Sequence, residues 1–163
     1  MGAIPIDGDG RFSGYASVFN RLDGGGDVVL PGAFSKSLSR KRGRIRLLFQ
    51  HDPKEPVGIW ESLGEDSHGL FVSGQLTGGV PRAEALRRLI EARALDGLSI
   101  GFRTVKASRE PGTGHRLLHE IDLYEVSIVT FPMMEDARIA APSRPARRLP
   151  PPHDKSATDR GNR

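Results

Sequence analysis

The sequence predicts a mainly β protein with flanking α-helices, an α+β fold, in one domain. Its apolar residues fall mostly in short runs that alternate with polar residues, and turns rich in glycine and proline separate these runs. One longer segment instead repeats apolar residues at helical spacing. With 163 residues, the chain is long enough to bury a hydrophobic core. It contains no cysteine, so neither a disulfide nor a thiolate metal site is expected.

Charge and proline content separate a globular domain at residues 11–140 from a flexible lead-in at 1–10 and a tail at 141–163. The formal net charge is +4, and the whole excess lies in the tail, which has six basic and two acidic residues. The tail also holds five prolines and almost no large apolar side chain. We therefore expect it to be disordered, because it cannot bury enough surface to offset its ordering entropy. Nucleic-acid binding is expected only through this basic tail, because the domain itself is neutral.

No apolar run approaches the roughly 18 residues that a membrane-spanning helix needs. The N-terminus also lacks the basic and then apolar pattern of a secretory signal. We therefore expect an intracellular protein that is not secreted and has no membrane partner.

The first half of the chain predicts strands and one short helix. Arg11–Asn20 is a strand with a bend at its inserted Gly14. Phe34 and Leu38, four residues apart, mark a short helix over Ala33–Ser39. Two further strands are predicted at Asp27–Leu30 and Ile45–His51.

The second half continues the pattern of strands and adds the longest helix, Pro81–Ala94. Proline suits the first turn of a helix, and an apolar stripe follows at helical spacing, formed by Leu86, Leu89, Ile90 and Ala94. Strands are predicted at Pro56–Trp60, Gly69–Leu76, Leu98–Phe102 and His119–Phe131.

Ser99 is a candidate nucleophile. Large apolar residues alternate with small ones from Leu98 to Phe102, which predicts a strand with Ser99 on its less apolar face. Gly97 and Gly101 remove side chains on both sides of Ser99, so that another backbone or a substrate can approach closely. A lone serine of this kind is more often only a small residue at a crowded position. Its chemistry therefore depends on partners elsewhere in the chain.

His51 is the candidate base. The strand that contains it ends at Asp52–Pro53, because a residue before proline is restricted in conformation. A turn at this point would leave the imidazole ring free. Among the four other histidines, His119 is the only serious rival.

Glu125 is the candidate for orienting the histidine, and Asp122 is the alternative. Positions 122 and 125 differ by an odd number, so a regular strand without a bulge places them on opposite faces. Glu125 would lie among mostly apolar neighbours, where an unpaired charge is costly, so a partner is expected. A serine is a weak nucleophile until an imidazole takes its proton, and the imidazole needs an anion to fix its tautomer.

Four stretches in unbroken order over roughly residues 11–140 are more specific together than any one of them. They are Asp27–Phe34, Leu48–Asp52 with Pro56–Gly58, Gly97–Phe102 and Leu123–Pro132. Together they resemble the prohead (capsid maturation) proteases of tailed bacteriophages, a family similar in fold to the herpesvirus assembly protease, assemblin. The resemblance implies a small, mostly antiparallel β-barrel with flanking helices and a serine–histidine active site.

The resemblance also implies roles for individual residues. His51 would be the base and Ser99 the nucleophile. Glu125 is the best match by position for the third member, and Asp122 stays open. The related viral proteases use an arginine near the oxyanion. Arg138, the only arginine shortly after the last predicted strand, is its counterpart here, with backbone amides near Ser99 as the alternative. No metal or cofactor is implied.

The function implied by the resemblance is that of a serine endopeptidase that processes scaffold or the major capsid protein during prohead maturation, and usually cleaves itself. It would act in the host cytoplasm inside the immature capsid. Whether it forms a homo-oligomer is left open. The tail would then be a self-cleaved or capsid-targeting segment. The rival hypothesis is a non-catalytic capsid-assembly or scaffolding subunit with the same barrel.

Overall fold

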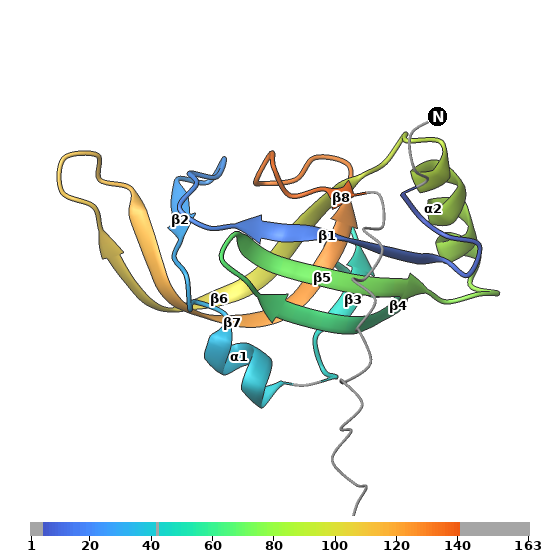
Figure 1. Ribbon diagram of the computed structural model, residues 1–163, viewed down its shortest axis with the longest axis horizontal. Coiled ribbons are helices and arrows are strands. Elements are labelled where there is room, and N and C mark those ends of the chain that lie inside the picture. Colours follow the sequence, from blue (N-terminus) through green and yellow to red (C-terminus); the bar gives the residue numbers. More distant parts are fainter. Residues whose placement is uncertain (1–4, 42, 141–163) are drawn as a thin grey trace, which may run out of the picture.

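The computed structural model describes residues 5–41 and 43–140, and it is mainly β with two helices (Figure 1). The helices are α1 (Ser35–Arg40) and α2 (Pro81–Glu91). The strands are β1 (Arg11–Val18), β2 (Asp27–Val29), β3 (Arg46–Phe49), β4 (Asp52–Glu65), β5 (Gly69–Leu76), β6 (Gly97–Arg109), β7 (Arg116–Val129) and β8 (Ile139–Ala140). Within the described ranges, no helix is both long and apolar enough to span a membrane.

β7 is the strand around which the sheet is arranged. β6 pairs with it in antiparallel fashion along one edge, from the pair Gly97 and Val129 to the pair Arg109 and Arg116. On the other edge, β2 pairs in parallel with residues 116–118 and β3 pairs in parallel with residues 125–128. From β3 the sheet continues through antiparallel β4, β5, β1 and β8. Most pairings are thus antiparallel, as predicted, but the two parallel ones make the sheet mixed.

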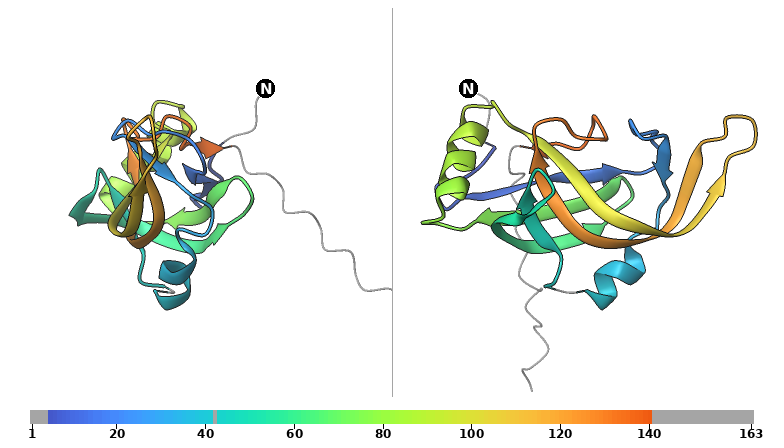
Figure 2. Two further views of the ribbon diagram at one scale, coloured as in Figure 1. Left: turned by 90° about the vertical axis from the view of Figure 1, so that its left-hand side faces the viewer. Right: turned by 180° about the vertical axis from the view of Figure 1, so that it is seen from behind.

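The sheet curls into an open half-barrel rather than a closed barrel (Figure 2). One bridge, between Gly97 and Arg138, links the start of β6 to the segment before β8. Two backbone hydrogen bonds support it, from Leu98 N to Ala137 O at 2.9 Å and from Ile139 N to Asp96 O at 2.7 Å. Because this contact is a single bridge and not a continuous ladder, the predicted barrel is only partly matched.

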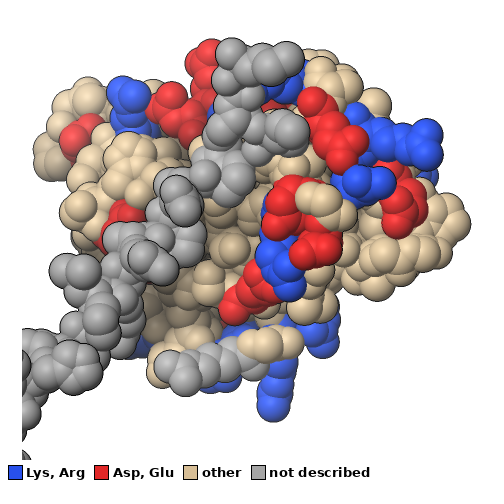
Figure 3. Space-filling model, turned by 45° about the vertical axis from the view of Figure 1, so that its right-hand side comes forward, with Lys and Arg blue, Asp and Glu red and all other residues tan. Residues whose placement is uncertain are grey.

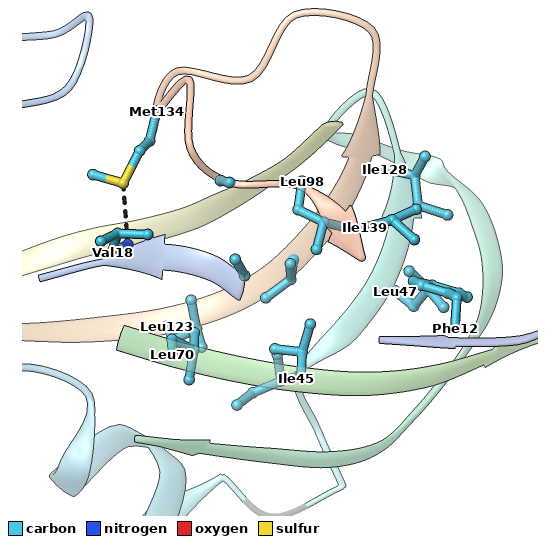
Figure 4. Close-up of a cluster of buried hydrophobic side chains, with 14 of the residues drawn as sticks. Phe12, Val18, Ile45, Leu47, Leu70, Leu98, Leu123, Ile128, Met134 and Ile139 are labelled. Carbon is cyan, nitrogen blue, oxygen red and sulfur yellow. Dashed lines mark hydrogen bonds between the residues drawn. The ribbon is translucent and has the colours of Figure 1, made fainter. Parts of the chain in front are cut away.

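The hydrophobic core fills the inside of the curled sheet. Strands far apart in the sequence contribute fully buried side chains, including those of Phe12, Leu47, Leu70, Leu98, Leu123 and Ile128 (Figure 4). Burying each of these side chains contributes roughly 1.5–3 kcal/mol. The core therefore fixes which face of each strand points inward, and with it the direction of the polar residues that alternate with the core positions.

Several local predictions need correction. The predicted lead-in is not free in its second half, because Ile6 is buried and forms a bridge with Phe12. The irregularity in β1 lies at Ala16, not at Gly14. Gly14 lies against the segment before β8, where a β-carbon would be 2.1 Å from the carbonyl oxygen of Arg138. The predicted disordered tail lies outside the described residues.

Charged side chains of both signs lie next to one another on the face seen in Figure 3. Ion pairs also connect distant parts of the chain, such as Arg116 with Asp27 at 2.6 Å and Lys36 with Glu120 at 2.7 Å. This interspersed pattern agrees with the balanced charge of the domain.

Helix α2 offers a test of core packing, because Leu86 is buried whereas Leu89 is 44% exposed. Leu86→Ala should lower the free energy of unfolding by about 2–5 kcal/mol, since it leaves a cavity. Leu89→Ala should change it by only about 0.5 kcal/mol. Urea denaturation of both variants measures the difference, and both carry the same change in helix propensity. Equal losses would show that α2 does not pack as described.

Candidate active site

His51 lies in a two-residue turn between β3 and β4, not within a strand. Phe49 pairs with Asp52, which leaves Gln50 and His51 as the two turn residues. Their φ angles are +54° and +58°, as in a type I′ hairpin turn. Neither residue is glycine, so both adopt a left-handed conformation that is uncommon for residues with a β-carbon. The predicted strand therefore ends two residues earlier, at Phe49.

Hydrogen bonds to the end of β7 hold this turn in place. Gln50 N donates to Ile128 O at 3.0 Å, and His51 N donates to Ser127 Oγ at 3.1 Å. The Gln50 side chain donates to Thr130 Oγ1 at 2.8 Å and accepts from Thr130 N at 3.3 Å. These contacts hold the turn in its strained conformation. Strained backbone conformations persist only where the surrounding structure holds them in this way.

The His51 ring meets the carboxylate of Glu125, as Nδ1 hydrogen-bonds Oε1. A carboxylate only accepts hydrogen bonds, so Nδ1 carries the proton and Nε2 is left as the acceptor in the neutral ring. The hydrogen bond to Glu125 raises the pKa of His51 against the opposing effect of burial. The second carboxylate oxygen, Oε2, accepts from Ser127 Oγ at 2.7 Å.

Gly101 provides the space for the Glu125 carboxylate. The two residues are paired across β6 and β7, and a β-carbon on Gly101 would lie 2.0 Å from Glu125 Oε1. Real β-carbon contacts essentially never come under 3.0 Å. Gly101 was expected to let a backbone or a substrate approach. The space beside it is instead occupied by the carboxylate of Glu125 from the neighbouring strand.

A β-bulge at Tyr124 means that the parity expected of a regular strand does not apply to β7. Gly101 pairs with Glu125 and Phe102 pairs with Leu123, so Tyr124 has no partner in β6. The buried core positions of β7 accordingly change from odd to even numbers across the bulge, from Ile121 and Leu123 to Val126 and Ile128. In a regular strand Glu125 would share a face with Leu123. Because of the bulge, it does not.

Asp122 lies apart from His51 and anchors the region of α1. Its carboxylate pairs with Arg40 and Lys41, each at 2.8 Å, and lies 3.8 Å from Arg103. The hydrogen bond from Lys41 is the main cause that lowers the pKa of Asp122 to about 2. The structure therefore gives the two carboxylates different partners.

Ser99 lies at the wall of a cavity of about 250 Å³ that His51 also lines. The strand pair β6–β7 places Ser99 opposite Ser127, and Ser99 is 6% exposed. Polar groups at the cavity include Asp23 and Asp27. The rest of the lining is mainly apolar and includes Ala16, Val29, Leu98, Ile100, Phe102, Met133 and Met134.

Arg138 and His119 have other partners. Arg138 Nη1 pairs with Asp96 Oδ1 at 2.7 Å, and its Nε donates to Glu135 O at 2.8 Å. His119 Nε2 lies 2.7 Å from Ser108 Oγ on the exposed part of the β6–β7 hairpin. Neither residue is among the described side chains that line the cavity.

Sequence reasoning missed Gln50 and Ser127. No local signal marks Gln50, because its role comes from contacts with the far end of β7. Ser127 did carry a signal, since it follows Glu125 by two residues in a strongly apolar strand and therefore shares its face.

Asp122 gives a stability prediction with a definite sign. Folding lowers the pKa of Asp122 from its ordinary value of 3.8 to about 2. The stability that its ionised carboxylate contributes is therefore complete above about pH 4 and is lost as the pH falls toward 2. The wild type should therefore be more stable than Asp122→Asn at pH 5, and the difference should shrink toward pH 2. Denaturant unfolding across this range measures it. A difference that does not vary with pH would contradict the assignment.

Comparisons with known proteins show which family the chain matches. The model of the caudovirus prohead serine protease family matches residues 4–149. The chain is 42% identical over 143 residues to the prohead protease of Enterobacteria phage HK97, covering 85% of this chain and 64% of that protein. It is 29% identical over 129 residues to the prohead protease of Escherichia phage T5, covering 78% and 60%. The chain thus spans less than two thirds of the length of both relatives.

Two solved structures share the fold. The capsid assembly protease of bacteriophage T4 superposes with a TM-score of 0.63 at 14% identity, covering 81% of this chain and 90% of the T4 protein. The KSHV protease in complex with a hexapeptide phosphonate inhibitor gives a TM-score of 0.51 at 16% identity, covering 79% and 63%. At these identities the likeness concerns the fold alone.

Proposed function

The chain belongs to the caudovirus prohead serine protease family, and from this we propose that it is a serine endopeptidase that processes capsid proteins. The observation that carries the proposal is the His51 ring, bound by the Glu125 carboxylate at the wall of a cavity that Ser99 also lines. A histidine oriented by a carboxylate beside a serine is the arrangement used for nucleophilic acyl transfer.

In the proposed mechanism, His51 Nε2 takes the proton of Ser99 Oγ as this oxygen attacks the carbonyl carbon of the scissile peptide bond. The C–N bond then breaks, and His51 returns the proton to the leaving amine. A water molecule, deprotonated in turn by His51, hydrolyses the acyl-enzyme and regenerates Ser99. Glu125 keeps the proton on Nδ1 and stabilises the imidazolium that forms. These steps require Ser99 Oγ to come within hydrogen-bond reach of Nε2.

Backbone amides near Ser99 are the better candidates for binding the oxyanion. Arg138 instead pairs with Asp96 and is not among the described residues that line the cavity beside Ser99. Asp122 is not proposed as the third member, since two cations already bind its carboxylate. The likeness to the KSHV protease supports assigning the curled sheet to the small, mostly antiparallel barrel of that type.

The proposed substrates are the scaffold, the major capsid protein and the chain itself, cleaved during prohead maturation inside the immature capsid in the host cytoplasm. The names of the HK97 and T4 proteins support this setting. The mainly apolar cavity beside Ser99 is the proposed position for a substrate side chain. The alternative, a non-catalytic assembly subunit with the same fold, predicts no cleavage at all.

Ser99→Ala should abolish cleavage of the capsid protein and shortening of the chain, because it removes the attacking oxygen. Mass spectrometry of the purified chain, alone and mixed with the capsid and scaffold proteins, follows both reactions over time. Ser108→Ala is the matched control, since it removes the exposed serine that contacts His119, and it should cleave normally. Equal cleavage by the wild type and Ser99→Ala would refute the proposal.

Glu125→Gln should lower turnover strongly, by up to about ten-thousandfold, without unfolding the sheet. The raised pKa of His51 also predicts that activity rises with pH through a midpoint above the ordinary value of 6.5, because the base must be neutral. In Glu125→Gln this midpoint should move to lower pH. Asp122→Asn, the matched control, should keep both turnover and midpoint. Normal cleavage by Glu125→Gln together with an inactive Asp122→Asn would reverse the assignment.

A further inference from the structure

The hydroxyl of Ser127 lies between two parts of the proposed active site. Its Oγ donates to Glu125 Oε2 at 2.7 Å and accepts the backbone N–H of His51 at 3.1 Å. Ser127 itself is fully buried. One side chain therefore connects the carboxylate and the histidine backbone, while the carboxylate contacts the histidine ring directly.

The position of Ser127 in the sheet explains why it reaches both groups. In β7 it pairs with Ser99 of β6 on one edge and with Leu48 of β3 on the other. It follows Glu125 by two residues, so both side chains lie on the same face of the strand. The turn after β3 then brings the His51 amide over this face. Ser127 thus lies between β6, which supplies Ser99, and the turn after β3, which supplies His51, on the same strand as Glu125.

We propose that Ser127 is a positioning residue that fixes Glu125 and His51 relative to each other. This inference rests on the proposed function of Ser99, His51 and Glu125. Ser127 occupies Oε2, so Oε1 is the oxygen presented to His51 Nδ1. It also accepts the amide of a residue in a left-handed turn, where φ is +58°. The hydroxyl thus acts as a donor to Glu125 and as an acceptor from His51 at the same time.

Removing the hydroxyl should disturb the site in two ways. The Glu125 carboxylate would lose the donor on Oε2 and could rotate away from the His51 ring. The His51 amide would lose its acceptor, which would loosen the strained turn. Both changes act on the geometry of the base and not on substrate contacts, so kcat should fall while KM changes little.

A second buried serine provides a matched control. Ser37 is also fully buried. Its Oγ accepts Leu123 N at 2.7 Å and donates to Asp122 Oδ1 at 3.5 Å. Ser37→Ala therefore deletes the same kind of bridge between an amide and a carboxylate, at a place apart from Ser99. Any loss of kcat that arises only from removing a buried hydroxyl should appear equally in Ser127→Ala and Ser37→Ala.

The test compares Ser127→Ala with Ser37→Ala by steady-state cleavage of a peptide that spans a site mapped with the wild type. We expect kcat of Ser127→Ala to fall by roughly 10- to 100-fold, the size of effect typical of hydrogen bonds to charged groups. KM should stay nearly constant, and Ser37→Ala should keep the wild-type kcat. NMR of ¹⁵N-histidine protein supplies the second readout: the Nδ1–H and backbone amide signals of His51 should shift in Ser127→Ala only.

A folded Ser127→Ala protein with either the wild-type kcat or unshifted His51 signals would overturn the inference. If this variant does not fold, Ser127→Cys replaces it under the same criteria, since a thiol is a similar shape but only a weak donor. Ser99→Ala separates the two levels of proposal. Cleavage by Ser99→Ala defeats the proposed function, whereas an inactive Ser99→Ala with an unimpaired Ser127→Ala defeats the positioning role alone.

Discussion

The pairing of β7 on both of its edges is the constraint on which the site depends. Antiparallel β6 brings Ser99 beside Ser127, and parallel β3 delivers the turn that carries His51 to the same place. His51 and Glu125 are 74 residues apart in the sequence. They nevertheless meet, because the strand before His51, β3, is a direct neighbour of β7, which carries Glu125. The core positions of β7 hold this register, because a slip by one residue would turn the whole buried set outward.

Two carboxylates on one strand have acquired different environments. Asp122 is buried against cations of the α1 region, which keep it ionised and use its charge to join that region to the sheet. Glu125 contacts a histidine and a serine instead. The bulge at Tyr124 lies between them and allows the strand to change its inward-facing positions. Bulges of this kind commonly re-aim side chains next to active sites.

The site combines a rigid frame with a strained element. Gln50 and His51 both adopt left-handed backbone conformations, which cost free energy for residues with a β-carbon. Hydrogen bonds that Gln50 and His51 donate to Ile128, Ser127 and Thr130 compensate for this cost and fix the turn. The ring of His51 therefore extends from a fixed point toward Glu125, and its orientation does not depend on a mobile loop. Such preorganisation keeps a catalytic group close to its working geometry.

The sequence alone determined the mainly β class, the position of most strands and both helices, because these depend on local periodicity and turn residues. It also singled out His51, Ser99 and Glu125 by residue type and position, and the resemblance of four stretches indicated the family that the comparison then showed. Ser127 could have been added, since its spacing from Glu125 places both on one face. These properties can be read locally because each involves only a few neighbouring residues.

Only the tertiary structure decided the parallel pairing of β2 and β3 with β7, the bulge at Tyr124 and the left-handed backbone of Gln50 and His51. It also decided that Gly101 makes room for Glu125 and that the carboxylate of Asp122 pairs with a cation of α1. Each of these depends on which distant segments lie side by side. A period of two looks the same whichever strand is the neighbour, so alternation along one strand cannot reveal its partner, its register or a bulge that the partner induces.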